Sequence, residues 1–164
     1  MDMLFKLYRL PSLEASLRRS EASGIGIRRA MAYERGRVIQ WVEQTFGHLW
    51  SSECAVAFAR QPIGCHIAVQ SQALCGFCCI ESTYRNFLGP VGVEKQARGK
   101  GVGGALVLFA LNELRHCGYA YAVVGDVGEP QFFKHVAGAV EIPGSSPGAY
   151  PEKLLQGNRR RNDL

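Results

Sequence analysis

Six glycines fall within the 16 residues from Gly89 to Gly104, and this cluster restricts the possible folds more than any other feature. The chain has 19 glycines, against about 11 at average usage, so the excess is concentrated here. An apolar run ending at Val93 precedes the basic segment Arg98–Gly104, and a long apolar run follows it. That order predicts a strand, a glycine-rich loop and a helix. The free N–H groups and positive dipole end of such a helix, beside Arg98 and Lys100, predict a site for a phosphate-bearing ligand.

Other interpretations of the glycine-rich loop fit less well. A nucleotide-binding P-loop would end in Gly-Lys-Ser/Thr, which the segment lacks. Gly99, Gly101 and Gly104 do spell the G-x-G-x-x-G pattern of dinucleotide-binding folds, with Asp126 at a later strand end. However, a polar stretch separates Val93 from the first glycine, and the residues after Asp126 (127–164) are too few for the remaining units of that fold. A loop whose glycines only permit close helix–sheet packing stays open.

Hydrophobic periodicity along the chain predicts a mixed α/β (α+β) fold. Two helices precede an antiparallel meander of three strands, and a β-α-β unit follows the meander. The expected strands are Leu4–Tyr8, Ile25–Arg29, Cys65–Val69, Leu74–Ile80, Phe87–Val93, Tyr119–Val124 and Val140–Ile142, and the expected helices are Ser12–Ser20, Tyr33–Phe46, Trp50–Arg60, Gly101–Cys117 and Pro130–Ala137.

The loop Arg98–Gly103 matches the R/Q-x-x-G-x-G/A motif of the GCN5-related N-acetyltransferase (GNAT) superfamily. The surrounding segments resemble that family too: Phe87–Val93 its central strand, Gly101–Cys117 its pyrophosphate-binding helix, and Phe132–Ala139 its late helix. The similarity covers roughly residues 25–143. It implies one GNAT-like domain over residues 1–164, with a mixed, mostly antiparallel central sheet flanked by helices. Its core would span about residues 25–143, after a short N-terminal strand and helix extension.

The resemblance implies acetyl-CoA or another acyl derivative of coenzyme A as the co-substrate. Loop and helix amides would hold its pyrophosphate. The strand backbone would pair with the pantetheine arm, which requires an opening beside Tyr119–Val124, and a strand amide would face the thioester oxygen. The implied cofactor-binding residues are Val91, Gly92, Val93, Arg98, Gly99, Lys100, Gly101, Val102, Gly103, Gly104 and, on the late helix, Phe133.

The reaction implied by the resemblance is direct attack of a neutral amine on the thioester, which needs a general base. Glu81, at the end of the strand before the central one, is the first candidate, and Glu94, directly after the central strand, is the second. A solvated loop carboxylate is the alternative for each. The family's late helix commonly carries a tyrosine near the coenzyme sulfur, where this chain has Phe132 and Phe133. The coenzyme thiolate would then leave without assistance, or His135 or water would protonate it in place of the tyrosine.

The sequence thus predicts an acyl-CoA-dependent N-acyltransferase acting on a small-molecule or peptide amine. The missing tyrosine leaves open a second class, a non-catalytic acyl-CoA-binding sensor or regulatory module. The glycine pattern leaves open a third, a dinucleotide-dependent oxidoreductase. A homodimer is the family-level expectation.

Charge and hydropathy give no indication of nucleic-acid or membrane binding. The net charge is +5, and residues 1–40 carry eight basic and four acidic side chains, with a further basic cluster at Arg159–Arg161. No aromatic residues alternate with these charges, so we expect solvated surface. The longest uncharged run, Gln61–Ile80, is interrupted by polar residues, and no signal peptide precedes it. These features predict a cytoplasmic protein.

Cysteine spacing suggests a metal site that strand geometry argues against. Cys75 and Cys78 have the spacing of a zinc knuckle, but they lie in the expected strand Leu74–Ile80. Residues three apart on a strand face opposite sides, so we expect no shared ion, and no second pair of ligands follows. The six cysteines are therefore expected to be free thiols, mostly buried.

Overall fold

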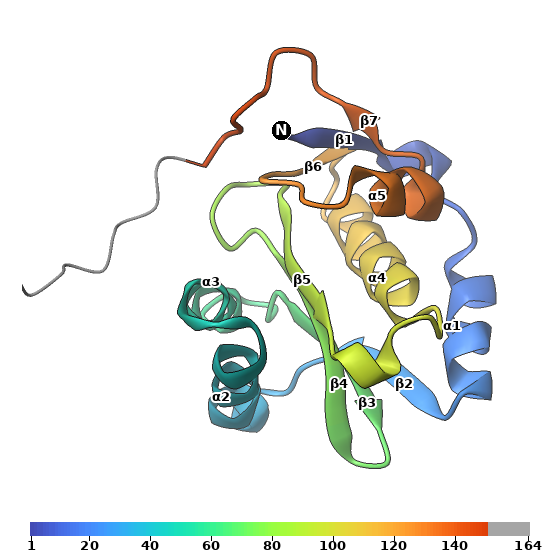
Figure 1. The fold of residues 1–164 in the computed structure, drawn as a ribbon, viewed down its shortest axis with the longest axis vertical. Helices are drawn as coiled ribbons and strands as arrows, with labels where there is room; N and C mark the ends of the chain where they lie inside the picture. The colour runs from blue at the N-terminus through green and yellow to red at the C-terminus, as the bar shows by residue number, and fades with distance from the viewer. Residues whose placement is uncertain (151–164) are drawn as a thin grey trace, which may run out of the picture.

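The computed structural model describes residues 1–150, which form two antiparallel sheets with helices packed on both sides (Figure 1). The first sheet has the strand order β2-β3-β4-β5 and the second the order β6-β1-β7. The strands are β1 (Met3–Lys6), β2 (Ile25–Arg29), β3 (Cys65–Gln70), β4 (Ala73–Ile80), β5 (Leu88–Val93), β6 (Tyr121–Val124) and β7 (Val140–Glu141), and the helices are α1 (Leu13–Ala22), α2 (Arg35–Phe46), α3 (His48–Phe58), α4 (Val102–His116) and α5 (Pro130–Ala137). The basic cluster Arg159–Arg161 lies outside the described residues.

This architecture confirms the predicted fold class, with shifts at the ends of elements. The helix expected from Trp50 begins at His48, because Gly47 (φ 99°) ends α2 and leads directly into α3. The β3–β4 hairpin closes more tightly than expected. Its turn consists of Ser71 and Gln72, whose φ values of 48° and 64° are typical of a two-residue hairpin turn. No helix within residues 1–150 is long and apolar enough to cross a bilayer.

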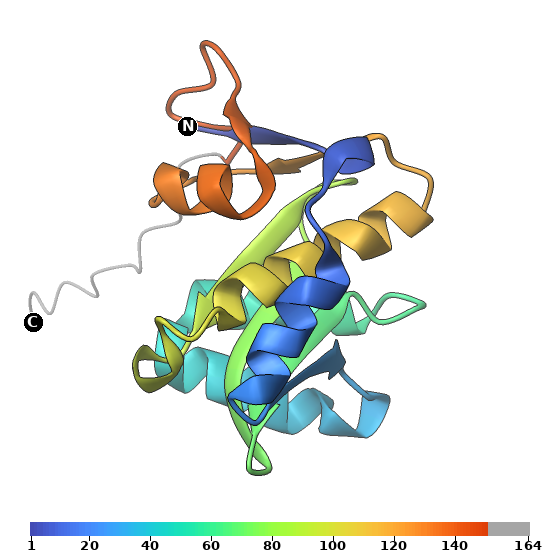
Figure 2. The same ribbon diagram turned by 90° about the vertical axis from the view of Figure 1, so that its right-hand side faces the viewer.

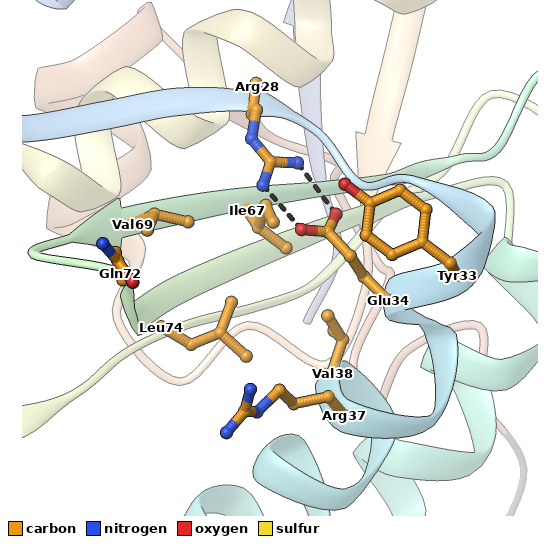
Figure 3. Close-up of a pocket in the computed structure, with 9 residues that line it drawn as sticks. All are labelled: Arg28, Tyr33, Glu34, Arg37, Val38, Ile67, Val69, Gln72 and Leu74. Atoms are coloured by element: carbon orange, nitrogen blue, oxygen red, sulfur yellow. Dashed lines mark hydrogen bonds and ion pairs between the residues drawn. The ribbon is translucent and has the colours of Figure 1, made fainter.

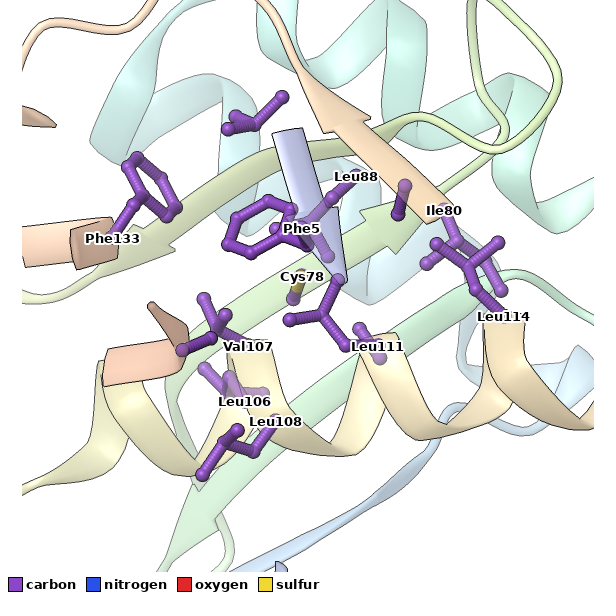
Figure 4. Packing of buried hydrophobic residues seen from close by; sticks show 14 of the residues in the cluster. Phe5, Cys78, Ile80, Leu88, Leu106, Val107, Leu108, Leu111, Leu114 and Phe133 are labelled. Carbon is purple, nitrogen blue, oxygen red and sulfur yellow. The ribbon is translucent and has the colours of Figure 1, made fainter. Parts of the chain in front are cut away.

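The larger core lies between α4 and the sheets. Helices α1 and α4 lie side by side on one face of the first sheet (Figure 2). Leu106, Leu111 and Leu114 on α4 are fully buried, and they pack in one cluster with Phe5 of β1 and Leu88 of β5 (Figure 4). This burial fixes the axis of α4, and with it the position of the glycine-rich loop at its start.

A second core lies on the opposite face of the first sheet, under α2 and α3. Phe77 of β4 is fully buried there. Phe46 packs on it with ring centroids 5.5 Å apart, and Trp41 and Trp50 close around the same ring at 6.2 Å. These aromatic side chains therefore hold the α2–α3 pair on the sheet.

Strand β1 lies in the middle of the second sheet. Met3 pairs with Val124 of β6 on one side and with Glu141 of β7 on the other. The side chains of Met3, Phe5 and Leu7 are completely buried. The strand that the sequence places in an N-terminal extension is thus the central strand of this sheet.

One expectation about the cysteines is wrong. Cys75 and Cys78 do not face opposite sides of β4, because both side chains belong to the core cluster under α4. The β3–β4 register shifts between Ala68 and Val69, opposite Cys75, and this bulge resets the alternation of side chains. All six cysteines are free thiols, five of them buried and Cys117 exposed.

Candidate functional site

The glycine-rich loop depends on glycine at two positions. Gly99 and Gly101 adopt φ values of 77° and 80°, which side chains disfavour, and the space where each Cβ would stand is open. On either side of them the chain is anchored by Ala97 and Val102, which are almost completely buried. The loop is therefore anchored at both ends and has open space beside Gly99 and Gly101.

The first turn of α4 offers unpaired amides to this open surface. The first loop-to-helix bond runs from the Ala105 N–H to the Gly101 carbonyl at 3.0 Å, so the amides of Val102, Gly103 and Gly104 precede the helical ladder. No side chain of the described residues caps the helix, and its first turn has no acidic residue. The positive end of the helix dipole therefore lies beside the exposed, positively charged Lys100.

Strand β5 is open along one edge because β5 and β6 separate. They share a single parallel bridge, between Phe87 and Val123, in the part of the chain that the structure describes. The Glu94 N–H donates to the Cys75 carbonyl on β4. Because backbone groups alternate along a strand, those of Val91 and Val93 point away from β4. They face the opening between β5 and β6, which we call the fork. Arg98 Nε donates to the Val93 carbonyl from this side at 3.0 Å.

Two of the predicted glycines have packing reasons for being glycine. A Cβ on Gly92 would stand 2.7 Å from the Phe46 ring, so the space beside Gly92 is filled by α2. A Cβ on Gly103 would stand 3.2 Å from the Phe132 ring. The structure thus brings Phe132 beside the start of α4. Phe133 is buried and packs edge-on against Phe5, with ring centroids 6.0 Å apart.

Glu81 lies at the closed end of the fork and is tightly held. Its carboxylate accepts hydrogen bonds from the Asn86 N–H at 2.9 Å and from the Arg60 guanidinium. Burial raises the pKa of this carboxyl, but the Asn86 N–H, the Tyr119 hydroxyl and the charge of Arg60 outweigh it and the pKa is lowered. Glu81 is therefore ionised at neutral pH and its two oxygens are engaged.

Glu94 lies at the other end of β5, beside the glycine-rich loop. Val93 pairs with Gly76, whereas Leu88 pairs with Ile80 at the far end of the same ladder. Leu88 and Val93, at the two ends of β5, are five residues apart, which corresponds to about 16 Å along a strand. The two predicted bases therefore cannot serve the same reacting atom.

Sequence reasoning missed a polar cluster at the closed end of the fork. Glu53 on α3 accepts hydrogen bonds at one carboxylate oxygen from the Thr83 hydroxyl (2.7 Å) and the Tyr150 hydroxyl (3.2 Å). Tyr84 packs on Phe87 with ring centroids 4.9 Å apart. Burial, followed by the charge of Glu53, raises the pKa of Tyr150 to about 12, so this hydroxyl stays protonated. No local motif links these residues, since they come from a helix, a turn and the loop before residue 151.

A pocket of about 400 Å³ lies elsewhere, between α2 and strands β2, β3 and β4 of the first sheet (Figure 3). Its base is apolar, with Ile67, Val69 and Leu74. Its rim carries a bidentate ion pair in which Arg28 donates to Glu34 at 2.6 and 2.8 Å. None of the predicted site residues lines it.

Comparison with protein families identifies this arrangement. A model of the acetyltransferase (GNAT) family matches residues 35–134, which is more than half of the chain. The chain therefore belongs to the GNAT family of acetyltransferases, as its loop motif predicts. The comparison with curated proteins gives no significant match.

Solved structures of GNAT proteins share the fold. The GCN5-related glucosamine N-acetyltransferase region of a fungal multi-domain GH3 β-N-acetylglucosaminidase is 18% identical, with a TM-score of 0.68 over 83% of this chain and 19% of that one. A GCN5-related N-acetyltransferase from Sphaerobacter thermophilus is 20% identical, with a TM-score of 0.60 over 85% of this chain and 47% of that one. The chain thus spans less than half the length of each. A GNAT acetyltransferase from Brucella melitensis, solved with acetyl-CoA, is 23% identical, with a TM-score of 0.50 over 66% and 80%.

Proposed function

We propose that the chain transfers an acyl group, most simply acetyl, from coenzyme A to an amine by direct attack on the thioester. One observation carries this proposal: the open amides at the start of α4 lie at the end of a β5 edge that no strand within residues 1–150 covers. That pairing suits a ligand with a pyrophosphate at one end and an amide-bearing arm at the other. The similarly folded Brucella melitensis protein was solved with acetyl-CoA, which supports the choice of co-substrate.

The residues present fit such a ligand. The amides of Val102–Gly104, with Arg98 and Lys100, would hold the pyrophosphate, and the open space at Gly99 and Gly101 admits it. The backbone of Val91 and Val93 would bind the pantetheine arm as an added strand. The Val91 N–H faces the fork and would donate to the thioester oxygen. Bound acyl-CoA supplies the activated acyl group.

The amine would enter from the α3 side of the fork and lose a proton to a carboxylate. Glu81 and Glu94 remain the bases proposed from the sequence, and the geometry adds Glu53. Thr83 and Tyr150 both donate to the Oε1 atom of Glu53, which leaves Oε2 to accept from an amine or a water. The acceptor itself is a small-molecule or peptide amine.

Ligand binding and turnover test the proposal separately. Acetyl-CoA at a hundred times its Kd should stabilise the chain by about 2.7 kcal/mol, whereas NAD should not. Thermal unfolding with each ligand measures this. Stabilisation by NAD alone would instead indicate a dinucleotide-binding protein.

Release of free coenzyme A thiol, measured with a panel of amines and peptides, tests catalysis. Replacement of the base by glutamine should lower kcat by about 100-fold or more. We compare Glu53→Gln, Glu81→Gln and Glu94→Gln at temperatures where each variant is fully folded. Stabilisation by acetyl-CoA without thiol release on any amine would favour the binding-module alternative.

A further inference from the structure

Three buried cysteines form a cluster on the α2–α3 side of the first sheet. Cys54 comes from α3, Cys65 from β3 and Cys79 from β4, and their Sγ atoms all lie within 4.8 Å of one another. Cys65 and Cys79 stand directly opposite each other in the β3–β4 ladder. All three side chains have no exposed surface. None of them takes part in the proposed acyl transfer.

The spacing of the sulfurs fits a single bound ion. With metal–sulfur bonds of about 2.3 Å, three ligands in a trigonal or tetrahedral arrangement stand roughly 3.8–4.0 Å apart. Cys54 Sγ and Cys65 Sγ are already 3.9 Å apart. The third sulfur would need to move by roughly an ångström or less, which a small side-chain rotation supplies.

The cluster offers three sulfur ligands, and within residues 1–150 no histidine, carboxylate or further cysteine joins them. The three cysteines belong to the hydrophobic core cluster that also contains Val42, Ala57 and Phe77. His66 follows Cys65 in sequence, and both of its ring nitrogens are buried without a hydrogen bond. Its ring, however, packs on Phe109 of α4 at 5.2 Å, on the other face of the sheet. A structural zinc ion takes four ligands, whereas Cu(I) is a soft ion selected by thiolates.

Cysteine binds a metal ion as the thiolate, so metal binding changes the protonation of the cluster. Cu⁺ bound by all three sulfurs releases to solvent every proton that the three thiols carried.

We propose that Cys54, Cys65 and Cys79 form a binding site for a soft, three-coordinate metal ion with the chemistry of Cu(I). The ion would join α3 to the β3–β4 hairpin. It would therefore connect α3, which carries Glu53, to β4, which Glu81 directly follows. The ion would not contact the fork.

The test is an anaerobic titration of the reduced full chain with Cu(I), in competition with a chromogenic Cu(I) chelator. We expect one equivalent to bind, a thiolate-to-copper absorption band in the near ultraviolet and a higher midpoint of thermal unfolding. Cys54→Ala and Cys79→Ala should each lower the affinity at least 100-fold. Cys78→Ala is the matched control, because Cys78 is equally buried on the same strand but belongs to the cluster under α4.

Equal loss of affinity in Cys78→Ala and Cys79→Ala would overturn the proposal, and so would full binding by a Cys54→Ala/Cys79→Ala double variant. X-ray absorption on the copper-loaded wild type gives a readout that needs no variant to fold. Three sulfur neighbours are expected. A nitrogen or oxygen neighbour, or only two sulfurs, contradicts the site. Zn(II) is titrated as a competitor. Tighter binding of Zn(II) than of Cu(I) also overturns the assignment.

Discussion

At Gly101 the backbone enters α4 with φ 80° and ψ −1°, in the left-handed region, and nothing lies within 4 Å of the missing Cβ. A side chain in that region costs about 1–2 kcal/mol. Gly101→Ala should lower the unfolding free energy by about that amount and raise the Kd for acetyl-CoA at least tenfold, because strain displaces the amides. Calorimetric titration measures the Kd.

The matched control for Gly101 is Gly36 in α2, which also has open space at its Cβ but no positive φ. Gly36→Ala should leave the Kd unchanged and stabilise the chain by about 0.5–1 kcal/mol. An unchanged Kd in Gly101→Ala would show that the loop does not hold the ligand.

His66 gives a pH dependence of stability with a definite sign. Burial, with a smaller contribution from the charge of Arg29, lowers the pKa of His66 to about 3. The unfolded chain takes up this proton below about pH 6.5, while the folded chain does not until about pH 3. Stability should therefore be constant in this respect above pH 6.5 and fall as pH decreases, by about 2 kcal/mol at pH 5.

Urea unfolding at pH 7.5 and pH 5 checks this contribution of His66. His66→Phe should remove most of the difference between the two pH values, whereas the exposed His135→Gln should retain it. The lowered pKa of Glu81 acts in the same direction, but only near and below its ordinary value of 4.5. A wild-type slope in His66→Phe would disprove the assignment.

At the scale of elements, β5 and α2 meet at Gly92, where a Cβ would stand 2.7 Å from the Phe46 ring. Gly92→Ala should therefore destabilise the chain by about 1–3 kcal/mol through overpacking. In the Phe46→Leu background the same change should cost much less. Denaturant unfolding of the double-mutant cycle measures the coupling. The control is Gly26→Ala in β2, which has open space and no positive φ, and whose effect should be small.

The turn after β4 depends on Glu81, which binds Arg60 and the Asn86 N–H. Glu81→Gln should lower the unfolding free energy by about 2 kcal/mol, less than the loss of a fully buried ion pair, because Arg60 is partly exposed. Glu94→Gln is the control, since Glu94 is partly exposed and forms no ion pair in the described chain. Equal stability of the two variants would leave Glu81 no structural role.

Local patterns predicted most elements because each carries its own signal. Gly47 and Gly101 mark helix ends, and alternating apolar residues mark the strands. The bulge at Cys75 could not be predicted, because it depends on the register with β3. The reason for Gly92 was also out of reach, since Phe46 is far from it in sequence. The loop motif located the candidate site, but Glu53 and Tyr150 meet only through the fold.

At the scale of the whole molecule, β1 joins the two ends of the described chain. Besides pairing with β6 and β7, it is followed by Leu7, whose N–H donates to the Ala120 carbonyl just before β6. The carboxylate of Asp2 accepts from the Ala149 N–H at 2.8 Å and the Asp126 N–H at 3.3 Å. Such pairings across more than a hundred residues have no local sequence signal. The position of β6, which forms one side of the fork, therefore depends on its contacts with the N-terminal residues.

Phe5 tests whether β1 holds the molecule together. Its ring is fully buried and packs edge-on against Phe133, so Phe5→Ala should cost about 3–5 kcal/mol of unfolding free energy. Tyr8→Ala is the control, because Tyr8 lies just beyond β1 and is half exposed, and it should cost under about 1 kcal/mol. Because β6 forms one wall of the fork, loss of β1 should weaken acetyl-CoA binding together with folding. Denaturant unfolding with and without acetyl-CoA measures both. If β1 were only an accessory extension, Phe5→Ala would leave the acetyl-CoA affinity and the main unfolding transition unchanged.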